Sequence, residues 1–145
     1  AEAASRVSLQ FSVERDVDGR IVVEPGRRGA SMDGSEAVAM RVDLRGGGGW
    51  LYLVEVAGGE PKPLYPTGAP QQLGPGLYPL RSADGDDLVY RPDAPGAVRL
   101  IALLTDEPVD PSRTVQGVLE AGGSRPDLWP RHVLSVDELD LTWEP

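Results

Sequence analysis

Apolar and polar residues alternate along three stretches of this chain, as they do in strands that bury one face. The first stretch runs from Val7 to Val13, the second covers residues 38–44, and the third covers residues 139–143. Because successive side chains of a strand point to opposite faces, this alternation predicts half-buried strands. Turn-forming residues 16–19 and the apolar run 21–23 follow the first stretch, and together they predict a hairpin.

Two other stretches, residues 50–56 and 98–104, are apolar on both faces. Strands of this kind lie in the interior of a packed β structure, so we predict that these two strands pair with each other. The core is expected to contain Trp50, Val54, Val98, Leu100 and Leu104. The run Gly46–Gly49 is a short link, which predicts that the strand at residues 38–44 pairs antiparallel with the Trp50 strand.

Breaker residues divide the rest of the chain, which contains 18 glycines and 14 prolines. Residues 26–36 and 67–76 are predicted to be loops, because turn formers dominate both of them. The proline-bound segment 61–66 is predicted to be an edge strand, since proline cannot donate to a ladder. A last strand is expected over residues 132–143, with a break near Asp137–Glu138. Short strands are predicted at residues 77–80 and 88–90.

One short helix is predicted near residues 111–121. Asp110 suits the N-cap, Pro111 suits the first turn, and Gly122 suits the position after the helix. An apolar stripe at residues 115, 118 and 119 gives this helix one face to bury. The whole pattern predicts an all-β fold, an antiparallel β-sandwich with this helix on a sheet, formed as a single domain by residues 1–145.

The formal net charge of −9 argues against two classes of partner. Nucleic acid and an anionic membrane surface would both repel the chain, so neither is expected to bind it. There is no cysteine, which excludes disulfides and thiol chemistry. No stretch approaches 18 apolar residues, so we expect no membrane insertion by this segment. Residues 1–4 lack a hydrophobic segment, and we interpret them as a mature end after cleavage or the cut end of a longer protein.

Catalytic chemistry finds little support in the residue pattern. His132 is the only histidine, and no serine lies in a nucleophile-elbow motif, so we interpret this histidine as structural. Gly46–Gly49 precedes a tryptophan and a strand, whereas a phosphate-binding loop requires lysine and a helix there. No pair among the 23 acidic residues is singled out for glycoside hydrolysis. We therefore expect no enzyme activity, no cofactor and no catalytic residue.

The alternative to that interpretation is calcium binding, because calcium requires only oxygen ligands and the chain has acidic turns at residues 16–19 and 84–87. Both turns cluster carboxylates around a glycine, but neither continues into a full calcium-binding loop. We expect ordinary turns and no metal site. If calcium does bind, the ligands are expected among Asp16, Asp18, Asp84, Asp86 and Asp87.

The order of strands and motifs resembles a bacterial family, the domain of unknown function numbered forty-three eighty-four. The likeness covers about residues 25–115 and rests on Gly49-Trp50-Leu51-Tyr52, then Leu64-Tyr65-Pro66, then Leu73-Gly74-Pro75-Gly76. The resemblance implies a small β-sandwich-like accessory module attached to larger bacterial proteins. It supplies no catalytic residues that could be assigned to this chain. It implies that the fold is built by Trp50, Leu51, Tyr52, Leu64 and Pro66.

We therefore expect a non-catalytic interaction module of a larger or membrane-anchored bacterial protein, located outside the cytoplasm in the periplasm or at the cell surface. A protein partner is expected to bind the 67–76 loop and its neighbours, because loops on a rigid scaffold concentrate binding residues. The candidate contact residues are Tyr65, Tyr78, Gln71 and Gln72. A calcium- or carbohydrate-binding module and a carboxylate-based hydrolase remain the alternatives.

Overall fold

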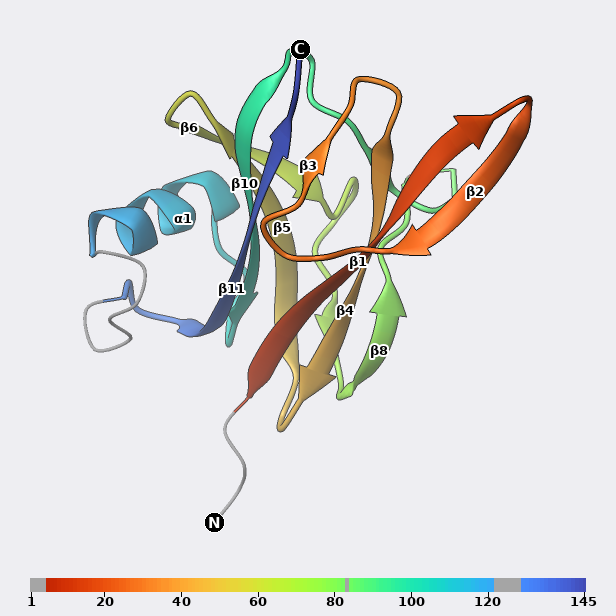
Figure 1. Ribbon diagram of the computed structural model, residues 1–145. Coiled ribbons are helices and arrows are strands. Elements are labelled where there is room, and N and C mark those ends of the chain that lie inside the picture. The colour runs from red at the N-terminus through yellow and green to blue at the C-terminus, as the bar shows by residue number, and fades with distance from the viewer. Residues whose placement is uncertain (1–4, 83, 122–128) are drawn as a thin grey trace.

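Two sheets packed face to face form the fold in the computed structural model, which describes residues 5–82, 84–121 and 129–145 (Figure 1). The first sheet has the order β2-β1-β4-β8, with β9 also paired to β4. The second has the order β3-β11-β10-β5-β6, with β7 also paired to β5. All pairs are antiparallel except β3 with β11. The predicted antiparallel β-sandwich is confirmed.

The strands and the helix have the following bounds: β1 Arg6–Val17, β2 Arg20–Pro25, β3 Ser31–Met32, β4 Ala37–Arg45, β5 Gly49–Ala57, β6 Glu60–Tyr65, β7 Gln72–Leu73, β8 Gly76–Pro79, β9 Val89–Tyr90, β10 Gly96–Thr105, α1 Pro111–Glu120 and β11 Val133–Trp143. The first hairpin, the short strands near residues 77–80 and 88–90, and the edge position of β6 agree with the prediction. The predicted loops 26–36 and 67–76 each contain a two-residue strand, β3 and β7. Pairing with a neighbouring sheet creates these strands, and no local pattern marks them.

The strands β5 and β10 pair in the centre of the second sheet, as their two apolar faces predict. Their inward side chains, such as Leu53 and Leu100, belong to the core between the sheets. Their outward side chains, such as Val54 and Ile101, are covered by α1. Four of the five residues predicted for the core are buried, but Trp50 is only partly buried, because it lies at the margin of the helix-covered cluster.

The helix α1 begins and packs as its sequence predicts (Figure 1). The Asp110 side chain accepts hydrogen bonds from the backbone N–H groups of Ser112, at 3.1 Å, and Arg113, at 3.3 Å. Val115 is buried against the outer face of the second sheet. Gly117 fits here because a Cβ atom at this position would lie 2.6 Å from Cγ of Pro130. The predicted role of Gly122 lies outside the described residues.

The predicted pairing of residues 38–44 with the Trp50 strand is wrong. In the structure β4 lies between β1 and β8 in the first sheet, whereas β5 lies in the second. The glycine run therefore crosses from one sheet to the other. It passes so close to other backbone that a Cβ atom on Gly48 would lie 2.2 Å from the carbonyl oxygen of Leu73, and one on Gly49 would lie 2.5 Å from that of Thr105.

The predicted break in the last strand is also wrong, because β11 runs without interruption to Trp143. Polar side chains of β11 accept hydrogen bonds from the backbone of β1, whose edge lies beside it. The backbone N–H of Leu9 donates to Asp137 Oδ2 at 2.6 Å, and that of Val7 donates to Ser135 Oγ at 3.1 Å. Arg28 adds a second donor to Asp137 Oδ2, also at 2.6 Å. Side chains of one sheet thus satisfy the open backbone of the other.

Candidate interaction site

The predicted contact loop forms one wall of an open groove of about 440 Å³. Tyr65, Pro66, Gln71 and Arg81 are among the residues that line it. Tyr65 is only partly exposed, since it also packs against the core between the sheets. Burial raises the pKa of the Tyr65 phenol, so the hydroxyl stays neutral. The groove thus brings together two of the four predicted contact residues, Tyr65 and Gln71.

The other two predicted contact residues lie apart from this groove. Tyr78 lies on β8 in the opposite sheet, and its hydroxyl donates to the carbonyl oxygen of Gly74 at 2.9 Å. Gln72 lies in β7 opposite Trp50. Both residues therefore hold the loop on the sandwich.

The residues predicted to build the fold do so to different degrees. Leu51 and Tyr52 are buried on opposite faces of β5. The hydroxyl oxygen of Tyr52 accepts a hydrogen bond from the N–H of Val109, at 3.1 Å, and so anchors the segment before α1. Trp50 and Leu64 are partly buried, and Pro66 lines the groove.

Each of the two acidic turns uses one carboxylate in a local contact. Asp16 Oδ1 accepts from the N–H of Gly19 at 2.9 Å, which closes the hairpin turn. Asp87 lies 3.7 Å from Arg81 in an exposed ion pair. Within the described ranges, no group of three or more histidine or acidic residues has the arrangement of a metal site. The absence of calcium binding stays a prediction.

His132 lies between two carboxylates. Its Nδ1 is 2.8 Å from Asp106 Oδ1, and its Nε2 is 3.3 Å from Glu107 Oε2. The N–H of Asp106 also donates to the carbonyl oxygen of His132 at 3.0 Å. Both ring nitrogens are thus occupied by contacts that join the end of β10 to the start of β11. This geometry fits the structural interpretation of the histidine.

A polar pair formed by buried Tyr90 and partly buried Glu55 connects the two sheets at the opposite end. The Tyr90 hydroxyl of β9 donates a hydrogen bond to Glu55 of β5. Burial, and then the hydrogen bond and charge of Glu55, raise the pKa of Tyr90. The Tyr90 ring also meets the edge of Trp143, with centroids 5.7 Å apart and planes at 77°. This pair holds the sandwich together and faces no groove among those described.

The most exposed strand of the fold is β2, which sequence reasoning did not single out. It pairs with β1 over residues 12–25, and this paired segment, the β-arm, extends away from the sandwich body (Figure 1). All six residues of β2 are exposed, with Ile21 at 65% and Val23 at 57%. No other strand of the described residues pairs with the outer edge of β2. The β-arm therefore presents both apolar side chains and an open backbone edge.

The other strands at the ends of the two sheets are protected in ways that β2 is not. Edge strands avoid unwanted pairing by being short or by carrying lysine or proline. The opposite edge of the first sheet, β8, has four residues and ends at Pro79. In the second sheet, β3 has two residues, and β6 carries Pro61, Lys62 and Pro63. The only proline of β2 is its last residue, and no lysine is present.

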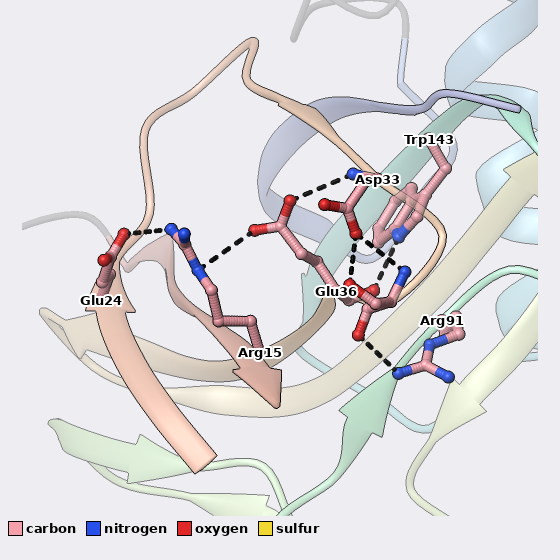
Figure 2. A network of polar contacts seen from close by, with 7 residues as sticks. Arg15, Glu24, Asp33, Glu36, Arg91 and Trp143 are labelled. Carbon is pink, nitrogen blue, oxygen red and sulfur yellow. Dashed lines mark hydrogen bonds and ion pairs between the residues drawn. The ribbon is translucent and has the colours of Figure 1, made fainter. Parts of the chain in front are cut away.

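A polar network fixes the base of the β-arm (Figure 2). Arg15 Nη2 lies 2.5 Å from Glu24 Oε2 across the hairpin, and Arg15 Nε lies 3.8 Å from Glu36 Oε2. Glu36 Oε1 accepts from the N–H of Asp33 at 3.1 Å. Hydrogen bonds from Ser35 lower the pKa of Asp33, so its carboxylate stays charged. The network holds the β-arm against the 26–36 segment. It thereby reduces the loss of conformational entropy that binding a partner would cost.

Comparison with protein family models, curated proteins and solved structures found no match for this chain. The resemblance of residues 25–115 therefore stays a prediction. No described helix is long and apolar enough to cross a membrane.

Proposed function

We propose that this protein is a non-catalytic interaction module that binds an extended segment of a protein partner along the edge of β2. One observation carries the proposal, namely that all six residues of β2 are exposed, Ile21, Val22 and Val23 among them, while no strand of the described residues pairs with its outer edge. Strand addition to an open edge is an established way to recognise a peptide, in which backbone hydrogen bonds supply affinity and alternate side chains supply specificity.

The register of the hairpin decides which backbone groups are free to bind. The N–H of Gly26 donates to the carbonyl oxygen of Phe11 at 3.0 Å, one position beyond the pairing of Ser12 with Pro25. Because such groups alternate along an antiparallel strand, the even-numbered residues of β2 face β1. Ile21 and Val23 therefore direct their N–H and C=O groups outward, where a partner strand would pair with them.

The groove beside Tyr65 supports the proposal less well. Tyr65 is partly buried there, and Tyr78 lies elsewhere. We therefore place the primary contact on the β-arm and not on the 67–76 loop. The wider setting that we propose, an accessory module of a larger or membrane-anchored bacterial protein outside the cytoplasm, rests on the family resemblance alone.

The proposal is tested with a generic strand probe, an octapeptide of alternating threonine and valine, titrated into the ¹⁵N-labelled protein. We expect chemical shift changes concentrated on residues 19–26. Val23→Pro removes an outward N–H without removing a bond to β1, so this variant should fold and lose the response. Val23→Thr keeps the N–H and the β-branched shape, so it should keep the response. Shift changes that are absent from β2, or that Val23→Pro leaves intact, would refute the proposal.

A further inference from the structure

The outer edge of β2 is complementary to itself, so we infer that one partner of the β-arm is the β-arm of a second copy of this chain. The inference rests on the proposed function, since it assigns a partner to the same edge. The sequence from Arg20 to Glu24 has a cationic residue at one end, an anionic residue at the other and three β-branched apolar residues between them. When two such strands run antiparallel about a two-fold axis at Val22, opposite charges meet at both ends.

The directions of the backbone groups select this register. Val22 faces β1, so across the two-fold axis the two Val22 residues form a pair without hydrogen bonds. Ile21 then lies opposite Val23 of the second copy, and these two residues have the outward N–H and C=O groups that such a pair exchanges. The symmetric pair on the other side of the axis does the same. Every outward group of Ile21 and Val23 is thereby satisfied.

The side chains agree with the same register. Arg20 lies opposite Glu24 of the second copy, and cross-strand pairs of opposite charge stabilise an antiparallel pair. Glu24 already contacts Arg15 of its own chain at 2.5 Å, and its carboxylate remains half exposed, with oxygen lone pairs for a second guanidinium. A register centred on Ile21 would place Asp18 opposite Glu24. One centred on Val23 would place Ile21 opposite Pro25, which has no N–H to donate.

The position of the β-arm leaves room for this pairing. The arm extends away from the sandwich body (Figure 1), and its base is held by the contacts of Arg15 with Glu24 and Glu36 (Figure 2). The pairing would join two first sheets into one continuous sheet across the axis. Each chain has a net charge of −9, which opposes association, so we expect a dimer that forms more readily as salt screens that repulsion.

Single-cysteine variants test the register directly, because the chain has no cysteine of its own. In the proposed register the Cα atoms of the two Val22 residues would lie about 4.5 Å apart, within the range of a disulfide. Those of the two Ile21 residues would lie roughly 8 Å apart, beyond that range. Under mild oxidation Val22→Cys should cross-link at least tenfold faster than Ile21→Cys. A mixture of Ile21→Cys and Val23→Cys should give the mixed cross-linked dimer.

Sedimentation of the unmodified protein provides the second measurement. The weight-average mass should rise from 15.5 kDa toward twice that value as protein concentration increases. Arg20→Glu places a carboxylate opposite Glu24 of the second copy, so this variant should need at least tenfold higher concentration for the same rise. Equal cross-linking of Val22→Cys and Ile21→Cys, or a protein that stays monomeric at millimolar concentration, would overturn the inference. If β2 still binds the threonine–valine octapeptide in that case, the proposed function stands with a different partner. If it does not, both proposals fail.

Discussion

Asp137→Ala should destabilise the protein strongly, because one carboxylate oxygen joins the two sheets. Asp137 Oδ2 accepts from the N–H of Leu9 and from Arg28, both at 2.6 Å. Removal of the carboxylate leaves the Leu9 N–H without its partner, which costs about 1–3 kcal/mol for a buried donor. Arg28 keeps its bonds to the carbonyl oxygens of Leu9 and Glu138, so its share of the loss is small.

The total that we expect for Asp137→Ala is about 2–3 kcal/mol of unfolding free energy, or roughly 5–10 °C in melting temperature for a chain of this size. Asp140→Ala is the matched control. Asp140 lies on the same strand and also pairs with an arginine, Arg99, at 2.8 Å, but its side chain is 65% exposed against 23% for Asp137. An exposed pair contributes only about 0–1 kcal/mol.

Urea denaturation followed by circular dichroism measures both variants. Asp137→Asn should fall between wild type and Asp137→Ala, since the amide oxygen still accepts from Leu9. If Asp137→Ala costs no more than Asp140→Ala, the reasoning is refuted, and the edge of β1 does not depend on β11 for its hydrogen bonds.

Three further predictions address the glycine crossover, the buried tyrosine and the acidic turns. Gly48→Ala should lower the free energy of unfolding by about 2–5 kcal/mol, because its Cβ would lie 2.2 Å from a backbone oxygen at a residue with positive φ. Gly58 also has a positive φ, but a Cβ there meets no neighbour, so Gly58→Ala should cost about 1–2 kcal/mol. Equal losses of stability in chemical denaturation would contradict the close backbone approach at the crossover. The raised pKa of Tyr90 means that the folded state holds the phenol proton more tightly, so stability is retained below pH 10 and falls as pH rises through the folded pKa. Tyr90→Phe should flatten that fall in a pH series of unfolding midpoints. An unchanged slope would exclude Tyr90 as the source of the fall. Millimolar calcium or a chelator should leave the thermal midpoint unchanged, and a calcium-dependent rise that Asp16→Asn or Asp86→Asn abolishes would establish a metal site instead.

Much of the fold could be predicted because the periodicity of apolar residues along the chain is a local signal of secondary structure and burial. Apolar and polar residues alternate in β1 and β4, which indicates burial of one face. Apolar residues occupy both faces of β5 and β10, which indicates burial of both. The helix is marked by Asp110 and by its apolar stripe. The assignment of strands to sheets is not local. A short glycine link is compatible with a hairpin and with a crossing between sheets, and only the long-range pairing of β4 with β1 and of β5 with β10 distinguishes the two.

The candidate site was harder to predict, because exposure on both faces leaves no periodic signal. The apolar run 21–23 resembles a buried strand, although these side chains are exposed in the structure. Of the predicted contact residues, Tyr65 and Gln71 line one groove, whereas Tyr78 belongs to the other sheet, and their contact with a partner stays a prediction. The missed signal was the absence of lysine and of interior proline from β2, in contrast to β6.

Amide hydrogen exchange at β2, measured by NMR at low and high protein concentration, tests the central claim most directly. The claim is that the outer edge of β2 is open in the free protein and is covered by a partner strand when one is present. In dilute protein the amides of Ile21 and Val23 should exchange fast, while that of Val22, which faces β1, should be protected. Raising the concentration, or adding the threonine–valine octapeptide, should slow exchange at Ile21 and Val23 and leave Val22 unchanged. Protection of Ile21 and Val23 in dilute protein, or fast exchange at both under every condition, would contradict the account.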